Sequence, residues 1–279
     1  MRVSVGDVEL HVHEKGEGRA LVALHGGPGL DGSVWFPGLN ALADQGWRVL
    51  APDHRANGRS DPGDPALWTV PQMADDVEAL ITALDLAEPV VIGWSFGSFV
   101  AQSHMARHGS AAAYVLMGTV AGTEALHAVS DRLAAFEPEH LRAQVTSSWE
   151  REATVETPEE CKRLMDDQWP FQVADPEGPL VQWLSENDHV VYSPAVLRHF
   201  AAGGEYGLTD LRGQLGSFSK PLLVLSGAAD RTTPAENAQE LVDAIPGAEH
   251  VVIDDCAHMI PYEQPEAFLA ALRSFLARV

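Results

Sequence analysis

The stretch EPVVIGWSFGSFVAQ, residues 88–102, joins a strand pattern to a helix pattern. Its apolar run at 89–94 predicts a buried strand, and the small and apolar residues at 97–108 predict a helix. A glycine stands two positions on either side of Ser95, which leaves room for a tight turn from strand to helix. A serine at the tip of such a turn is either a plain turn residue or a nucleophile, and the rest of the chain decides between the two.

Strand patterns alternate with helix patterns on both sides of this stretch. Residues Val3–Val5 and Val8–His13 alternate around Gly6 and Asp7 and predict an antiparallel hairpin. Further strands are expected at 20–24, 47–53, 89–94, 111–119, 220–226 and 248–254, and helices at 33–45, 71–86, 97–108, 234–245 and 265–278. This order is typical of the α/β class, with a mostly parallel, twisted sheet that carries helices on both faces.

The alternation stops between residues 122 and 215. This segment is rich in acidic residues and in helical patterns. We therefore expect a core formed by 1–121 and 216–279 and a helical cap formed by 122–215. Such an insertion is expected over the carboxyl edge of the sheet, where open α/β sheets bind their ligands.

The charge of the chain restricts its partners. Among 279 residues, 18 are basic and 40 are acidic, which gives a formal net charge of −22. Nucleic acid and anionic membranes are disfavoured because their phosphates would be repelled. The acidity has two interpretations, general solubility or a field that favours cationic substrates. The sequence leaves the oligomeric state open.

The compartment is predicted from cysteine usage and from the absence of targeting patterns. Cys161 and Cys256 lie far apart and give neither a disulfide framework nor a zinc spacing. Residues 1–10 do not resemble a signal peptide, and no run reaches about 18 apolar residues. We expect a cytoplasmic protein that spans no membrane.

An acid and an imidazole follow two later strands in the order that a serine nucleophile requires. A serine hydroxyl needs a base to accept its proton. Asp230 follows the strand at 220–226, and His258 follows the strand at 248–254, so the chain order is Ser95, Asp230, His258. Because parallel strands end at one edge of a sheet, we expect these three side chains to meet there as nucleophile, orienting acid and base.

Each of these residues also has a structural interpretation. His258 can be a surface histidine, because the chain has twelve, and Asp230 can cap the helix that follows Pro234. Asp254, Asp255 and Glu124 are rival acids. The complete arrangement favours Asp230 over them.

The glycine-rich segment LHGGPG, residues 24–29, follows a predicted strand. We expect the N–H groups of Gly27 and Phe96 to form an oxyanion hole. His25 is expected to order this loop by hydrogen bonding, and Arg55 to anchor its own loop by pairing with a carboxylate. No His-x-x-x-His helix or Cys/His cluster has ligand spacing, so we expect neither a metal nor a cofactor.

These motifs together resemble the α/β-hydrolase superfamily over essentially the whole chain. The motifs that carry the resemblance fall in that family's order: HGGPG (25–29), DHRANGRS (53–60), GWSFGS (93–98), GAADRTTP (227–234) and DDCAHMIPYEQPEAF (254–268). Within it, HGGPG is similar to the proline iminopeptidases and their relatives. The chain departs from that group at Asp53–Ala56 and at Trp94 and Phe96.

The resemblance implies hydrolysis of a small acyl compound, and it favours a proline iminopeptidase-like aminopeptidase or amide hydrolase over a second substrate class. In proline iminopeptidases, acidic cap residues hold the free amine of the substrate, which implies an aminopeptidase or amide hydrolase with Glu150 in that role. The alternative is a carboxylesterase or lactonase with an apolar pocket formed by Trp149 and Trp169. Trp94 either shapes this pocket or packs beside its strand. A third hypothesis is a binding module that has lost catalysis.

Overall fold

The computed structural model describes residues 1–36, 38–187, 189–203 and 206–279. Within these ranges it contains one eight-stranded sheet with the order β1-β2-β4-β3-β5-β6-β7-β8. Strand β2 pairs antiparallel with β1 and β4, and all other neighbours are parallel. The strands are β1 Arg2–Ser4, β2 Glu9–Lys15, β3 Arg19–Leu24, β4 Trp47–Pro52, β5 Val90–Trp94, β6 Ala113–Met117, β7 Leu222–Gly227 and β8 Glu249–Ile253.

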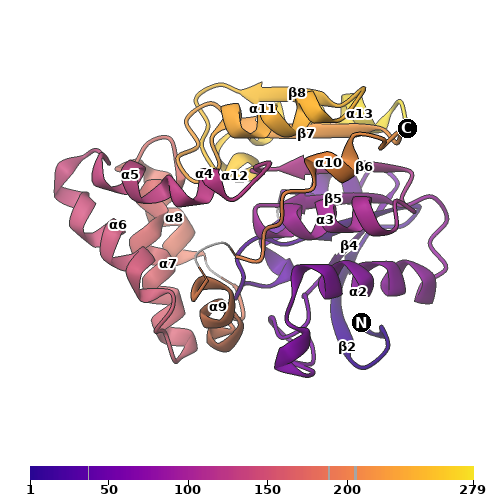
Figure 1. Ribbon diagram of the computed structural model, residues 1–279, viewed down its shortest axis with the longest axis horizontal. Helices are drawn as coiled ribbons and strands as arrows, with labels where there is room; N and C mark the ends of the chain where they lie inside the picture. Colours follow the sequence, from indigo (N-terminus) through magenta and orange to yellow (C-terminus); the bar gives the residue numbers. More distant parts are fainter. Residues whose placement is uncertain (37, 188, 204–205) are drawn as a thin grey trace.

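Helices cover both faces of this sheet because alternate residues of each buried strand point to opposite sides. In β5, Val91 faces the cluster that includes α2 and α3, whereas Val90 and Ile92 face the cluster that includes α1 and α13. Figure 1 shows α2 and α3 side by side on one face. The helices of these layers are η1 Gly32–Trp35, α1 Asn40–Ala43, η2 Pro65–Leu67, α2 Val70–Ala83, α3 Phe96–Arg107, α11 Ala235–Ala244, α12 Ile260–Glu263 and α13 Pro265–Leu276.

A group of helices lies between β6 and β7 in the chain and projects from one end of the sheet (Figure 1). These are α4 Glu124–His127, α5 Val129–Ala134, α6 Glu139–Arg151, α7 Pro158–Gln172, α8 Pro179–Glu186 and α9 Pro194–Ala201, followed by α10 Arg212–Leu215. Part of the group has its own small core, in which Phe136 and Phe171 pack edge to face. Helix α10 instead packs against α3 and α11. The division of the chain into core and cap at 122 and 215 stays a prediction.

The predicted strands and most predicted helices are confirmed, with boundaries within a few residues. The expected single helix at 33–45 is wrong. The described part of this segment forms the short helices η1 and α1, and Phe36 between them is extended, with φ −107° and ψ 132°. The residue at 37 is a proline, and a residue before proline is driven out of the helical region.

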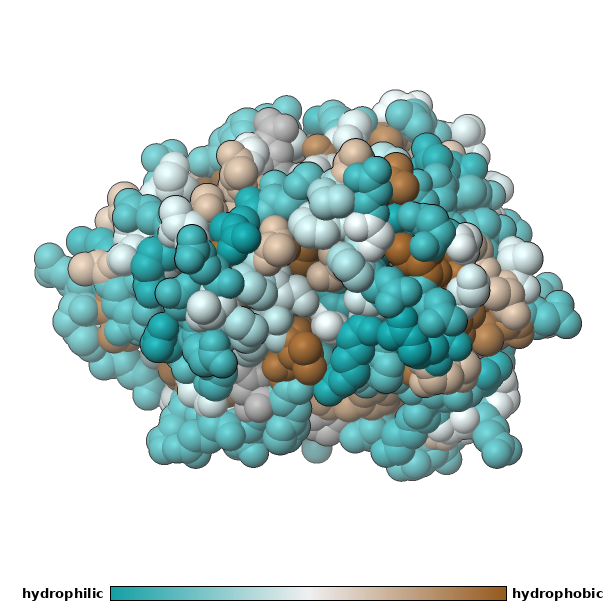
Figure 2. Space-filling model, turned by 90° about the horizontal axis from the view of Figure 1, so that it is seen from below, coloured by the Kyte–Doolittle hydropathy of each residue, from teal (hydrophilic) through white to brown (hydrophobic). Residues whose placement is uncertain are grey.

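The face of the molecule shown in Figure 2 is mostly hydrophilic, and its hydrophobic side chains form separate small patches. In the part of the chain that the structure describes, we find no helix with both the length and the apolar character needed to cross a bilayer.

Candidate active site

Ser95 occupies a strained turn between β5 and α3. Its φ of 54° and ψ of −118° lie where residues with a side chain are rarely found. The Ser95 N–H donates to the carbonyl of Met117 in β6 at 2.8 Å, which fixes the turn to the neighbouring strand. Strained backbone of this kind is tolerated where it presents a functional side chain.

The two glycines that flank Ser95 are required by close backbone contacts. A Cβ atom on Gly93 would lie 2.3 Å from the carbonyl oxygen of Gly97. A Cβ atom on Gly97 would lie 2.2 Å from the carbonyl oxygen of Leu24 in β3. Real Cβ atoms do not approach oxygen this closely, so the turn needs glycine at both positions.

Asp230 and His258 lie at the ends of β7 and β8 and form a buried pair. The Nδ1 atom of His258 is 2.8 Å from Oδ2 of Asp230, and the exposed fractions of the two side chains are 5% and 0%. Asp230 also accepts hydrogen bonds from the backbone N–H of Thr232 and from the N–H and hydroxyl of Thr233. Burial raises the pKa of Asp230, but the charge and hydrogen bond of His258 together with the bonds from Thr233 outweigh it and lower the pKa below its usual value. Asp230 is therefore ionised at neutral pH.

Ser95 and His258 line the same cavity, but no hydrogen bond joins the Ser95 hydroxyl to the His258 ring in the described parts of the chain. The bond that proton transfer needs is often long in a free enzyme and shortens when substrate binds. The rival acids lie elsewhere. Asp254, Asp255 and Glu124 are exposed, and Asp230 holds the imidazole.

The two expected oxyanion donors line the same cavity as Ser95. Phe96 follows Ser95 directly in the chain, and Gly27 lies in the loop after β3. Gly27 has a φ of 87°, which favours glycine. Phe96 is the first residue of α3, and the N–H groups at the start of a helix have no partner within the helix. The roles of the Gly27 and Phe96 N–H groups as oxyanion donors stay a prediction.

Two buried side chains hold the loops around this site. His25 accepts a hydrogen bond from the His54 N–H on Nε2, at 3.0 Å, so its proton is on Nδ1 and is donated to the carbonyl of Gly26. Burial lowers the pKa of His25, which keeps the ring in this neutral form. Arg55 makes two hydrogen bonds of 2.6 Å to Asp76, which fixes the loop after β4 to helix α2.

The loop that carries His258 is held on several sides. The indole N–H of Trp94 donates to the His258 carbonyl at 3.1 Å. One carboxylate oxygen of Glu263 accepts the N–H groups of Ala257 and Met259, which flank the histidine, at 2.9 and 3.0 Å. The sequence motif around His258 includes Glu263, but sequence reasoning did not assign it a role.

The same loop is bound to the end of α7. The His258 N–H donates to the carbonyl of Gln172 at 3.0 Å. The second oxygen of Glu263 accepts the N–H of Ala174 at 2.6 Å. Arg231, next to Asp230, donates to the carbonyl of Val173 at 2.8 Å. The end of α7 therefore contacts both loops that carry the acid and the base.

The cavity at Ser95 has a volume of about 800 Å³. Trp94, Trp149, Trp169 and Glu150 all line it, as the sequence predicted for a substrate site, although Glu150 is exposed. Most other lining side chains are apolar: Leu30, Val34, Phe36, Phe99, Leu126, Val129, Leu133, Met165, Trp183, Leu184, Val190, Leu197, Met259 and Tyr262.

A buried carboxylate in the cavity wall was missed by the sequence analysis. Glu152 follows α6, is 6% exposed and accepts hydrogen bonds from the side-chain amide of Gln168 at 2.7 Å and from the hydroxyl of Tyr206. Burial raises the pKa of Glu152. The helical period could have revealed Glu152, because residues three apart share a face and Glu152 is three residues after Trp149. Glu150 also lines the cavity but is exposed.

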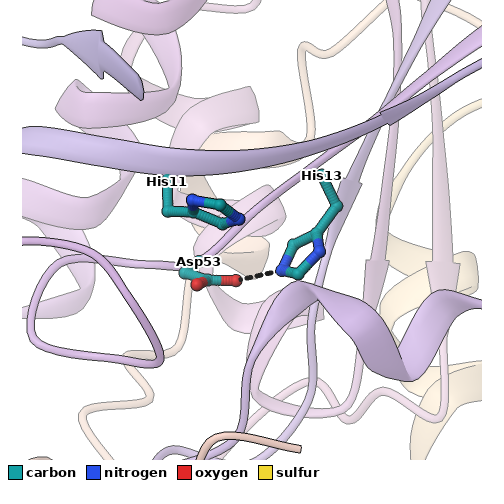
Figure 3. Close-up of side chains that lie close together, drawn as sticks. All are labelled: His11, His13 and Asp53. Carbon is teal, nitrogen blue, oxygen red and sulfur yellow. Dashed lines mark hydrogen bonds and ion pairs between the residues drawn. The ribbon is translucent and has the colours of Figure 1, made fainter. Parts of the chain in front are cut away.

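A histidine–aspartate cluster outside the cavity was also missed. His11 and His13 on β2 lie next to Asp53 after β4 (Figure 3). The signal was a His-x-His pattern on a predicted strand, since alternate residues of a strand share a face.

Comparisons with known proteins agree with this architecture. The chain is 28% identical over 280 residues to the AB hydrolase superfamily protein YisY of Bacillus subtilis, covering 96% of this chain and 95% of the relative. The structure of a thermophilic esterase from Thermogutta terrifontis matches with a TM-score of 0.76 and 26% identity, covering 100% of this chain and 98% of that one.

A proline iminopeptidase from Mycobacterium smegmatis also has a TM-score of 0.76, at 24% identity over 100% of this chain and 97% of that one, and this likeness concerns the fold alone. The model of the alpha/beta hydrolase fold family matches residues 19–265. The chain therefore belongs to the alpha/beta hydrolase fold family.

Proposed function

We propose that this protein is a serine carboxylesterase whose substrates carry a bulky apolar group. The observation that carries the proposal is that Ser95 and His258, which is paired with Asp230, line a cavity of about 800 Å³ with mainly apolar and aromatic walls. Such walls bind hydrocarbon and aromatic groups by removing their surface from water.

The arrangement supports a two-step acyl transfer. Ser95 attacks the ester carbonyl while His258 accepts its proton, and His258 then protonates the leaving alcohol. Water activated by His258 releases the acid in the second step. The ionised Asp230 orients the ring and stabilises the imidazolium. The N–H groups of Gly27 and Phe96 stabilise the oxyanion, so the scheme needs neither metal nor cofactor.

Glu150 gives little support to the aminopeptidase activity that the sequence favoured. Its side chain is exposed, so water screens its charge and weakens its attraction to a substrate amine. The 26% identity to the esterase from Thermogutta terrifontis, over both chains almost completely, supports ester substrates.

One observation favours an amine-bearing substrate as a second candidate. Glu152 is a buried carboxylate that lines the cavity, and a buried charge attracts an ammonium group more strongly than an exposed one does. Both of its oxygens already accept hydrogen bonds, from Gln168 and Tyr206. An amine would therefore have to share this carboxylate with the two neutral donors.

A substrate panel separates these possibilities. We expect p-nitrophenyl esters with aromatic or branched acyl groups to be hydrolysed faster than lactones or prolyl and alanyl arylamides. Substituting Ser95→Ala should lower ester turnover by about 10⁶-fold. Full activity of that variant would refute the proposal, and faster cleavage of free-amine arylamides than of their acetylated forms would favour the second candidate.

A covalent probe tests for the third hypothesis, a binding module without catalysis. A fluorophosphonate reacts only with an activated serine hydroxyl. We expect it to label the wild-type protein and not the Ser95→Ala variant. Absence of labelling in the wild type would favour the binding module.

A further inference from the structure

Strand pairing brings His11, His13 and Asp53 to one face of the sheet. His11 and His13 are two residues apart in β2 and therefore share a face. Strand β4 runs antiparallel to β2 with His13 opposite Ala51. The N–H of Asp53 continues this ladder by donating to the carbonyl of His11 at 2.8 Å, so Asp53 lies opposite His11. Figure 3 shows the three side chains converging from the two chain segments.

The distances between the ligand atoms of this cluster exceed those around a bound metal ion by at most about 1.5 Å. One ligand atom from each residue lies within 4.8 Å of the ligand atoms of the other two. Tetrahedral zinc with bonds of about 2.0 Å places its ligand atoms about 3.3 Å apart. The distance between His13 Nε2 and Asp53 Oδ1 is already shorter, at 2.9 Å. Binding therefore requires the partly exposed imidazoles to rotate toward the ion.

The carboxylate is held in place by backbone donors. The N–H of Gly32 donates to Asp53 Oδ1 and that of Arg59 to Oδ2, both at 2.8 Å. Donors of this kind fix the orientation of a ligating side chain and are a regular feature of metal sites. In the described parts of the chain, the His11 ring has no hydrogen-bond partner, so its ring nitrogens are available for a ligand.

We propose that His11, His13 and Asp53 bind a divalent transition metal ion such as Zn²⁺, at a site separate from the Ser95 cavity. Two imidazoles and one carboxylate suit zinc, whereas magnesium and calcium prefer oxygen ligands alone. The metal replaces the hydrogen bond between His13 and Asp53, and the neutral His13 ring then carries its proton on Nδ1. The His13 side chain is 19% exposed, which gives water access to a fourth position.

Binding at this site would join three segments of the fold. The ion connects β2 to the loop after β4, and Asp53 connects it to Gly32 at the start of η1. Because the unfolded chain does not hold these ligands together, the ion would bind the native state preferentially and raise its stability.

The test is titration of the metal-free full chain with ZnCl₂ in a calorimeter. We expect one saturable site in the wild type. Affinity should fall at least about tenfold in His11→Ala, which removes a ligand without breaking any hydrogen bond of the Asp53 side chain, and in His13→Gln. The matched control is His140→Ala, which removes an exposed histidine paired with Glu177 on the helical segment. The control should bind zinc as the wild type does.

Two further measurements use the same proteins. Zinc should raise the unfolding temperature of the wild type and the His140→Ala control, but not that of His11→Ala. Cobalt(II) should give the visible absorption of a tetrahedral site in the wild type and lose it in His11→Ala. Absence of saturable zinc binding in the wild type, or wild-type affinity in both His11→Ala and His13→Gln, would overturn the proposal.

Discussion

Glu263 is predicted to position His258 for catalysis without touching the substrate. One of its oxygens accepts the N–H groups of Ala257 and Met259, and the other accepts that of Ala174. In Glu263→Gln, only one oxygen remains, and the new NH₂ group faces a backbone donor. At least one buried N–H is then unpaired, which costs about 1–3 kcal/mol.

If this free energy is lost from the transition state because the His258 loop is displaced, kcat should drop by about 5- to 150-fold. KM for a p-nitrophenyl ester should change less than about twofold, because Glu263 does not line the cavity. The matched control is Glu266→Gln, which alters an exposed carboxylate in the first turn of α13. An unchanged kcat, or a change in KM alone, would contradict a positioning role.

The pH dependence of activity in the wild type and in Glu263→Gln is an independent test of the positioning role. Burial raises the pKa of Glu263, and the charge of Asp230 adds to this, although three backbone N–H groups act in the opposite direction. Protonation of Glu263 in the wild type also removes acceptor capacity. The ratio of wild-type to Glu263→Gln activity should therefore shrink as the pH falls through this raised pKa. A purely structural role that only lowered the folded fraction would shift the unfolding midpoint in urea, and kcat per folded molecule would stay constant.

Three further substitutions test other parts of the structure. Trp94→Phe removes the N–H that binds the His258 carbonyl and should lower kcat by about fivefold at 25 °C, a cost of about 1 kcal/mol, as steady-state kinetics would show. Gly97→Ala places a Cβ atom 2.2 Å from a β3 carbonyl and should cost about 3 kcal/mol or more in urea unfolding, whereas Gly213→Ala, with open space around it, should be neutral. Burial lowers the pKa of His104 to about 4 from 6.5, so the unfolded chain takes up this proton first as the pH falls. Wild-type stability should thus drop by about 2 kcal/mol more than that of His104→Gln between pH 7 and pH 5, and equal losses would contradict the shift.

The sequence alone predicted the candidate site residues that lie after the ends of strands. Ser95, Asp230 and His258 each lie after the end of a strand, and parallel strands end at one edge of the sheet. The need for glycine at positions 93 and 97 could also be predicted, because a tight turn at the end of a strand brings backbone atoms into close contact. Local pattern and topology together therefore predicted the Asp230–His258 pair, which the structure contains.

The contacts of Glu263 and Glu152 depend on how the helical segment between β6 and β7 packs against the rest of the chain. No local sequence pattern determines this packing. Glu263 binds Ala174, which is 89 residues away in the chain. Glu152 meets Tyr206 across 54 residues. The sequence showed acidic residues in this segment, but the exposure that separates Glu150 from Glu152 depends on the packing of α6 and α7.

The hydrogen bonds at the end of α7 connect the wall of the cavity to the loop that carries His258. The size of a bound substrate can therefore affect the position of that loop. Met165, Gln168 and Trp169 of α7 line the cavity, so a bulky substrate contacts this helix directly. The carbonyl of Gln172, at the end of the same helix, accepts the N–H of His258. Any displacement of α7 by substrate must therefore either carry the His258 loop with it or break this bond. If the protein is the esterase proposed above, substrates that differ only in the bulk of their acyl group should differ in kcat as well as in KM. The reason is that one helix, α7, forms part of the cavity wall and also binds the loop that carries the base.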